Sequence, residues 1–499
     1  MKQSKMMRIH ALFQITITLL LALFASGCSL APAYIPPEID LPGSFEKATT
    51  DETGQQNKRS SYEEVNREWW SSLNSKALLA LQKAALTNNY GYKADRWALA
   101  QSFSRARAAR STLMPLVNAS GSASRRGSDS EKGFSVSNAF SGSFQASYEL
   151  DIWGAKQDSV SAQEYGAVGN MYTWHVAGLT LESEVALTYF SYLAAWENLA
   201  VYDSMLRNAR EVLAYQETRE RLGTAAPLDV ARQRSSVENM EASRLGYERS
   251  ITEGRNNLCL LVGVSELPED IASLMEKERL QDIIAASVEA GIPSDLLIRR
   301  PDIATAELRL KAANANIGVA RAAFLPSFSL TASRGWQSDT LATLINPVNA
   351  MYSLGNSIAA SIFDNGSNIA RLDEAIASRN ELIERYRQAV LAAFWEVSTA
   401  LSAKEVLAKQ EQHRTASAMQ AAESLRIAQL RYKAGSEDFI SVLTAQDSVL
   451  SSDNNLIQSR LERLNIAIAL FKALGGGWGN QGNMDTMRKE FATAPRVTF

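Results

Sequence analysis

The run FSGSFQASYEL, residues 140–150, decides the fold of this chain. Apolar and small polar side chains alternate along it, which is the period of a β-strand with one apolar and one polar face. This alternation predicts four strands, over about 116–125, 136–150, 327–336 and 352–363. Each strand is near the roughly ten residues that cross a bilayer obliquely. Periodicity alone also fits a half-buried sheet on a soluble core.

The number of strands determines how a barrel can form. A membrane barrel needs at least about eight strands, and an open sheet would leave unpaired backbone groups at its edges in lipid. Four strands in one chain therefore predict a barrel that is shared between chains. Two chains would supply about eight strands and three about twelve, and periodicity does not choose between them.

Two very long helices follow the strands, over 155–222 and 367–434, and neither segment contains proline. At about 1.5 Å per residue, each helix would span on the order of 100 Å. A second helix then returns after each, over 227–262 and 439–474. Apolar spacings of mostly three and four, with charged flanks, predict two antiparallel coiled coils. An inert rod has the same pattern, but it does not account for membrane strands at one end.

The chain repeats itself at an offset of about 211 to 212 residues. The turn RERLG, which ends at Gly223, recurs as RYKAG, which ends at Gly435. A repeat this long is one large module built twice, because solenoid repeats run only about 20 to 50 residues. We expect the first repeat over 63–268 and the second over 269–478, followed by a tail over 479–499.

The N-terminus has the pattern of a targeting segment. Residues 1–27 combine basic residues, an apolar run and small residues before Cys28, as in a signal peptide. The stretch resembles a lipobox, although Ala25 stands where the pattern usually has Leu, and an ordinary secretory signal is the alternative. The lipobox implies S-diacylglycerol and N-palmitoyl groups on Cys28, and Ser29 is compatible with sorting to the outer membrane. Residues 28–62 then predict a lipidated, extended tether.

Composition excludes several classes of protein. A net charge of -3 argues against a nucleic-acid-binding protein, which would usually carry an excess of positive charge. Three His and two Cys leave little material for a metal site. No catalytic triad, phosphate-binding loop or zinc-binding His pair occurs. We therefore expect no enzyme, no cofactor beyond the covalent lipid, no metal and no nucleic-acid partner.

The segment GIPSDLLIRRPDI, residues 291–303, resembles the hallmark of bacterial outer-membrane efflux lipoproteins. Trp69-Trp70, LDIWG at 150–154 and GGGW at 475–478 are also similar to that family. It is the TolC/OprM-like outer membrane factor family of tripartite efflux systems, in its NodT-type lipoprotein branch. The resemblance covers nearly the whole mature chain. It implies an α+β membrane protein: a homotrimer whose twelve-stranded β-barrel, four strands per chain, continues into a long α-helical periplasmic barrel.

The centre of that hallmark is Arg299, Arg300, Pro301 and Asp302. An Arg pair is able to clamp a phosphate. Proline, however, fits the first turn of a helix, and an acidic residue there favours the positive end of the helix dipole. We therefore interpret the motif as a structural joint.

The resemblance implies that the two glycine turns are periplasmic tips that contact an adaptor protein and close the tunnel. A solvated helix end is the alternative. Relatives often have acidic residues further on, where this chain has Ser441 and Thr444, so an acidic ring would have to come from other residues. Arg431 and Tyr432 are expected to hold the tips through hydrogen bonds or ion pairs with neighbouring acids. The residues expected at the gate or adaptor contact are Gly223, Asp229, Arg431, Tyr432, Gly435, Glu437 and Asp438.

The sequence and the resemblance together predict an exit duct of a tripartite RND-type efflux pump. Its expected location is the outer membrane of a Gram-negative bacterium, with a lipid anchor and helices that extend into the periplasm. Its expected partners are two further copies of the chain, a periplasmic adaptor, an inner-membrane RND pump and outer-membrane lipid. The alternatives are a duct for metal cations or for type I protein secretion, and a non-conducting envelope scaffold.

Overall fold

A computed structural model gives the fold of the chain. Arg299, Cys28, the signal segment and the C-terminal tail lie outside the residues that the structure describes. The described residues are 29–42, 70, 73–130, 133–284 and 300–476.

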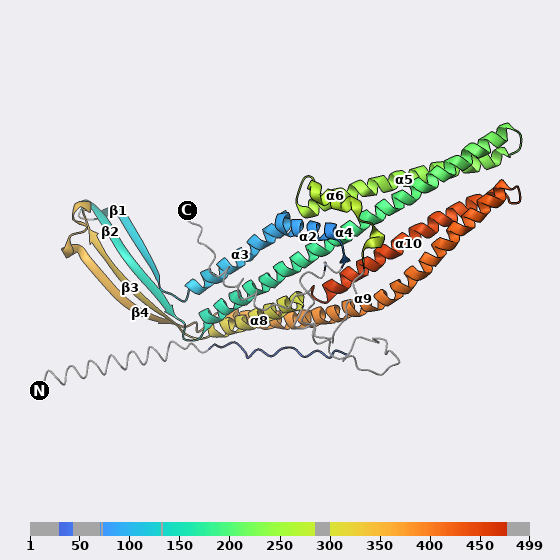
Figure 1. Cartoon of the computed structure of the whole chain (residues 1–499). Helices are drawn as coiled ribbons and strands as arrows, with labels where there is room; N and C mark the ends of the chain where they lie inside the picture. Colours follow the sequence, from blue (N-terminus) through green and yellow to red (C-terminus); the bar gives the residue numbers. More distant parts are fainter. Residues whose placement is uncertain (1–28, 43–69, 71–72, 131–132, 285–299, 477–499) are drawn as a thin grey trace.

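The molecule is elongated, with a β-sheet at one end and two long helical hairpins that extend from it (Figure 1). Short helices flank the hairpins near the middle of the molecule. The elements in chain order are α2 (Lys76–Asn88), α3 (Tyr90–Ser111), β1 (Leu116–Ser130), β2 (Gly133–Leu150), α4 (Ala155–Arg221), α5 (Pro227–Val262), α6 (Glu269–Lys277), η3 (Leu280–Asp282), α8 (Pro301–Ala322), β3 (Ser327–Ser338), η5 (Leu341–Thr343), η6 (Pro347–Asn349), β4 (Ala350–Ala359), α9 (Ser367–Lys433) and α10 (Phe439–Ala473).

The internal duplication is visible in the helices. The helices α4 and α9 are each 67 residues long, and α5 and α10 have 36 and 35 residues. Gly154 and Gly366 precede the two long helices with φ of 72° and 82°, a backbone region that glycine enters without steric cost. Asp151 and Asp364 accept hydrogen bonds from the first backbone amides of these helices. Two similar modules therefore leave the sheet through the same kind of turn.

The four strands form one antiparallel sheet in the order β1-β2-β3-β4. The hairpin of β1 and β2 is longer than the sequence predicts, because backbone pairing continues to Ser130 opposite Gly133, beyond the regular alternation. The strand β4 ends at Ala359 rather than at residue 363. The residues after it form the turn in which Asp364 caps α9.

The two faces of the sheet differ in chemistry. Phe144 lies opposite Ala119 and Arg334, so these three side chains share the largely apolar face. On the other face, serine hydroxyls hydrogen-bond to one another across neighbouring strands at 2.6 to 3.1 Å. The pairs are Ser120–Ser143, Ser122–Ser141, Ser128–Ser135, Ser329–Ser357 and Ser333–Ser353.

The largest core lies at the middle of the molecule, where α2, α4, α5, α6, α9 and α10 meet. Tyr189 and Phe190 of α4 are fully buried there. Glu278 accepts hydrogen bonds from the Tyr189 hydroxyl, the Ser75 hydroxyl and the backbone N–H of Ala77, so these three donors are paired at this core. Full burial of an aromatic or aliphatic side chain contributes roughly 1.5–3 kcal/mol, and this core holds the two modules together.

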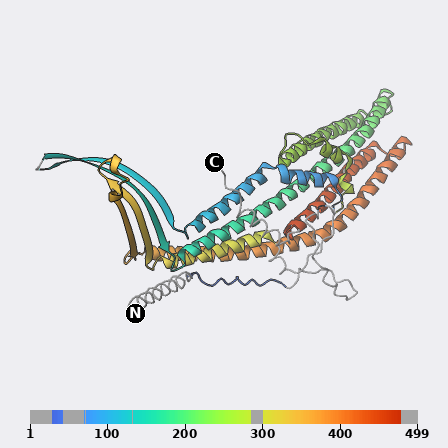
Figure 2. The same ribbon diagram turned by 60° about the vertical axis from the view of Figure 1, so that its left-hand side comes forward.

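Residues 29–42 are extended, as the sequence predicts, but they are fastened to the helices. Ile39 and Leu41 pack against the cluster formed by α8 and α9. In Figures 1 and 2 this blue segment runs beside these two helices. Within the described part of the chain, no helix is both long enough and apolar enough to cross a membrane.

Candidate functional site at the hairpin tips

Both long hairpins turn through a glycine with positive φ. The amide of Thr224 donates to the carbonyl of Arg219, and the amide of Ser436 donates to the carbonyl of Arg431, which closes the last turn of α4 and of α9. Gly223 has a φ of 74° and Gly435 a φ of 73°, with open space around both. Glycine is the residue that ends a helix this way at little cost. The two tips lie side by side, far from the sheet (Figures 1 and 2).

Tyr432 connects the two tips. Its hydroxyl accepts hydrogen bonds from Gln216 Nε2 at 2.6 Å and from Arg219 Nη1 at 2.8 Å, and both donors belong to α4. Its ring lies edge-on to Tyr215 and beside Phe439, with the Arg219 guanidinium 5.6 Å from the ring centre. Tyr432 therefore couples the second hairpin to the first through both polar and aromatic contacts.

Arg431, the preceding residue, makes a different contact. Its Nε lies 3.4 Å from Glu437 Oε2, within the turn of its own hairpin. Ser441 donates a hydrogen bond of 2.9 Å to the same carboxylate. The expectation that acids hold both residues is therefore wrong for Tyr432, whose partners are an amide and a guanidinium. Arg431 has an acidic partner, but that contact does not link the two hairpins.

The remaining tip residues lie at the starts of the returning helices. Asp229 is half-buried in the first turn of α5, and Asp438 is exposed immediately before α10. Thr444 donates to the carbonyl of Ile440 within α10. Ser441 and Thr444 stand where relatives often have acids, so an acidic ring would have to come from Asp229 on one tip and from Glu437 or Asp438 on the other.

Gln216 and Arg219 are tip residues that the sequence did not single out as functional. Gln216 is fully buried on α4, although glutamine is usually exposed. Arg219 also donates from Nη2 to the carbonyl of Thr224, which fixes the guanidinium against its own turn. The signal for Arg219 was its position in the repeated turn, where Arg431 is its counterpart.

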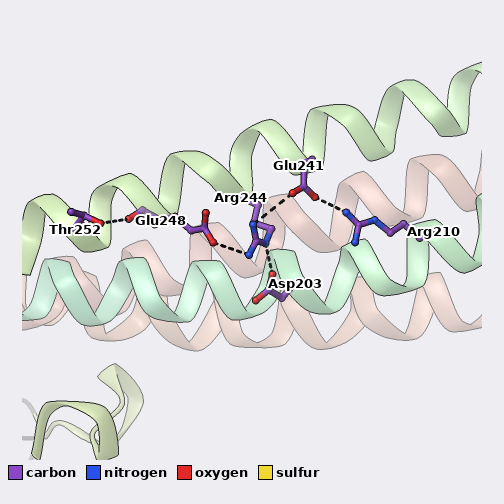
Figure 3. Close-up of polar contacts among 6 residues, drawn as sticks. All are labelled: Asp203, Arg210, Glu241, Arg244, Glu248 and Thr252. Carbon is purple, nitrogen blue, oxygen red and sulfur yellow. Dashed lines mark hydrogen bonds and ion pairs between the residues drawn. The ribbon is translucent and has the colours of Figure 1, made fainter. Parts of the chain in front are cut away.

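Ion pairs join α4 to α5 along the first hairpin (Figure 3). Arg244 of α5 contacts Asp203 of α4 at 2.7 Å and Glu248 of its own helix at 2.7 Å. Arg210 of α4 contacts Glu241 of α5 at 2.8 Å. A further pair, between Arg234 and Glu217 at 2.8 Å, lies closer to the tip. The first hairpin is thus cross-linked electrostatically at three levels.

The Arg-Pro-Asp part of the hallmark motif lies at the start of α8, far from the tips. Arg300 is 7% exposed and forms a bidentate contact with Asp302, at 3.1 and 2.7 Å. Its Nη1 donates to the carbonyl of Ala473 at the end of α10 and lies 2.8 Å from Glu396 of α9. Burial raises the pKa of Asp302, but the hydrogen bond and charge of Arg300 outweigh it, so this pKa lies below its usual value. Arg300 thereby joins three helices.

The described residues contain no group of three or more His, Cys, Asp or Glu side chains placed to hold a metal ion. A groove of about 420 Å³ lies between α5 and α10, lined by residues that include Arg232 and Asp447. Burial raises the pKa of Asp447.

A family model described as "Outer membrane efflux protein" matches the chain twice, over residues 81–264 and 292–476, once in each repeat. The pyoverdine export outer membrane protein OpmQ of Pseudomonas aeruginosa is 34% identical, over 83% of this chain and 88% of OpmQ. The cation efflux system protein CusC of Escherichia coli is 31% identical, over 92% of this chain and 97% of CusC.

Solved structures agree with the sequence relatives. The open-state outer membrane channel MtrE of Neisseria gonorrhoeae superposes with a TM-score of 0.78 at 29% identity, over 90% of this chain and 98% of MtrE. A membrane protein from Pseudomonas aeruginosa superposes with a TM-score of 0.80 at 28% identity, over 90% of this chain and all of that chain. The protein is thus an outer-membrane channel, and the chain belongs to the outer membrane efflux protein family.

Proposed function

We propose that this protein is the exit duct of a tripartite RND-type efflux pump, which passively conducts drugs or other small toxic compounds from the periplasm to the exterior. The observation that carries the proposal is a four-stranded sheet with two open edges that continues into helices of 67 residues. At about 1.5 Å per residue these helices are on the order of 100 Å long. Such a chain makes a wall segment of a tube, and a tube needs several copies.

The proposed assembly is a homotrimer with about twelve strands, which closes the edges that β1 and β4 leave open. A periplasmic adaptor would contact the tips, and an inner-membrane RND pump would supply the energy, so this chain acts as a conduit rather than an enzyme. Chemical crosslinking in mild detergent tests the trimer. We expect a ladder that ends at three subunits, and a ladder that ends at one would overturn the proposal.

The cargo is tested by genetics. Deletion of this chain should sensitise the bacterium to drugs or solvents, and the wild-type chain should restore resistance. A metal-cation duct is the second candidate, favoured by the 31% identity to the cation efflux protein CusC. Sensitivity to copper or silver alone would support that candidate. Unchanged sensitivity to drugs, solvents and metals, with a correctly assembled trimer, would contradict both.

A lipid anchor on Cys28 is part of the proposal. Several buried acyl chains hold a protein at a membrane, at roughly 0.8 kcal/mol per buried methylene. Metabolic labelling with a fatty acid should mark the wild-type chain but not Cys28→Ser. Label that persists in the mutant would exclude this site. The Cys28→Ser chain should keep partial function, because the barrel also anchors the protein.

A further inference from the structure

The segment that follows Cys28 makes specific contacts with the helices. The Ser29 hydroxyl donates a hydrogen bond of 2.6 Å to Asp158 Oδ1, at the start of α4. Arg321 Nη1 donates to the carbonyl of Leu30 at 3.0 Å, and Asn314 Nδ2 donates to the carbonyl of Pro32 at 2.6 Å. Both donors lie on α8. Side chains of α4 and α8 therefore hydrogen-bond to residues 29, 30 and 32 of this segment.

The contacts continue along α8 in order. Tyr34 donates to Glu307 Oε1 at 3.3 Å, and Lys311 Nζ lies 5.0 Å from the centre of the Tyr34 ring. Ile39 then packs against the cluster that includes Ile303, at the start of α8. The segment thus runs antiparallel to α8 from one end to the other. Proline residues at 32, 36 and 37 favour the extended conformation that this path requires.

The site is shaped to hold the segment. Asp158 is only 4% exposed and Asn314 only 8% exposed, so both are buried polar groups whose pairing depends on residues 29–32. Gly318 of α8 leaves room for the contact, since a Cβ there would overlap Asp158 Oδ2 and lie 2.7 Å from the backbone nitrogen of Ala31. Burial raises the pKa of Asp158, and the hydrogen bond from Ser29 opposes that shift.

We propose that residues 29–42 form a docking strap, and that Asp158, Asn314, Gly318 and Arg321 are the receptor site that seats the mature N-terminus beside the ends of the strands. An uncharged hydroxyl and two backbone carbonyls are the groups that this site recognises. The lipid anchor proposed on Cys28 would then enter the membrane at a fixed place on the channel instead of at the end of a free tether.

The consequence for residue 29 is specific. A carboxylate at this position would face Asp158 across a partly buried contact, and two like charges at that distance repel. The uncharged hydroxyl of Ser29 therefore suits the receptor site, because it donates a hydrogen bond to Asp158.

Electron paramagnetic resonance of a spin label at residue 35 tests the strap directly. Ile35 is 78% exposed, so Ile35→Cys attaches a label without disturbing the receptor site. The full-length protein is used, with Cys259→Ala to remove the free thiol. We expect an immobilised spectrum for the wild-type receptor. In Asp158→Ala the ratio of undocked to docked strap should rise about fivefold or more, the effect of losing one hydrogen bond. Gly318→Ala should raise the same ratio because its methyl group would overlap Asp158 and Ala31.

Two matched variants serve as controls. Asp158→Asn keeps an oxygen that accepts from Ser29, and Gly246→Ala adds a methyl group to a helical glycine with open space around it. Both should give the wild-type spectrum. Ser29→Ala, which leaves the helices untouched, should mobilise the label even if a helix variant fails to fold.

An immobilised label in Asp158→Ala, Gly318→Ala and Ser29→Ala would overturn the proposal. The measurement does not depend on export. Loss of efflux with an unchanged spectrum would therefore bear on the proposed function and not on the strap.

Discussion

The two long hairpins have the same length and the same turn, but they are held together differently. The first hairpin has ion pairs between its helices at three levels, of which the pair between Arg234 and Glu217 is the closest to the tip. In the second hairpin, Glu411 of α9 pairs with Arg460 and Arg463 of α10. Among the described residues from Glu411 to the tip, no ion pair joins α9 to α10.

The charges of the second hairpin are satisfied mainly within one helix. Pairs such as Arg426–Glu423 and Lys409–Glu405 link residues three or four positions apart on α9. Such pairs stabilise the helix but not its contact with a neighbour. The tip half of the second hairpin therefore depends on apolar packing and on Tyr432 for its position. The two repeats therefore share the shape of the hairpin but differ in the contacts that hold its tip half in position.

The largest expected effect is at Tyr432. Tyr432→Phe removes the acceptor shared by Gln216 and Arg219, at about 1 kcal/mol for a hydrogen bond. Counting only one such bond per copy, three copies in the proposed trimer would shift the balance of closed and open tips by roughly 100-fold, and the second bond adds to this shift. Single-channel conductance in a planar bilayer, without adaptor or pump, should show a leak. Arg431→Ser is the matched control and should leave conductance near wild type. A leak from Arg431→Ser with none from Tyr432→Phe would mean that Arg431, and not Tyr432, holds the tips closed.

The next effect concerns Glu182, which has no ionisable counterpart in the other repeat. Burial raises its pKa to about 7 from 4.5, whereas the equivalent residue of α9 is the buried Phe394. The folded protein binds this proton more tightly than the unfolded chain. Stability from this group is therefore complete below about pH 4.5 and is lost as the pH rises through about 7.

Glu182→Gln should remove this dependence, which amounts to at most about 3 kcal/mol per chain. The check is the melting temperature at pH 5 and pH 8. The wild-type protein should melt lower at pH 8, and the variant should show a smaller difference. An equal difference in both proteins would place the titrating group elsewhere.

The smallest effect tests the ion pairs of the first hairpin. Arg244→Ala removes contacts with Asp203 and Glu248 and should lower the melting temperature by a few degrees. Arg426→Ala of α9 removes only the contact with Glu423, within one helix, and should have a smaller effect. Thermal melts of the two variants side by side provide the measurement. If Arg426→Ala lowered the melting temperature more than Arg244→Ala, ion pairs between helices would not be what stabilises the first hairpin differently from the second.

Much of the architecture could be predicted from the sequence, because its signals are long and periodic. Alternation over residues 140–150 and the absence of proline in two segments of 67 residues leave few alternatives. The ends of the strands could be predicted less well. The pairing of Ser130 with Gly133 depends on the backbone ladder and not on side-chain pattern.

The partners at the tips could not be predicted for a geometric reason. Successive residues of an α-helix point about 100° apart, so Arg431 and Tyr432 face different neighbours. Which of the two faces α4 depends on how the hairpins pack, and packing is set by many distant contacts. The burial of Gln216 has the same origin. The docking of Ser29 on Asp158 joins residues 129 positions apart, and no local pattern marks it.

The serine pairs of the sheet have a consequence for permeation. With the apolar face toward lipid, the opposite wall presents hydroxyl groups that rotate and act as either donor or acceptor. Such a wall exchanges hydrogen bonds with water or with any polar solute at similar free energy, and it carries little fixed charge to trap an ion. The lumen of the β-barrel would then let polar solutes of different kinds pass without selecting among them. A new cargo would require a new pump at its entrance, with no change in these strands.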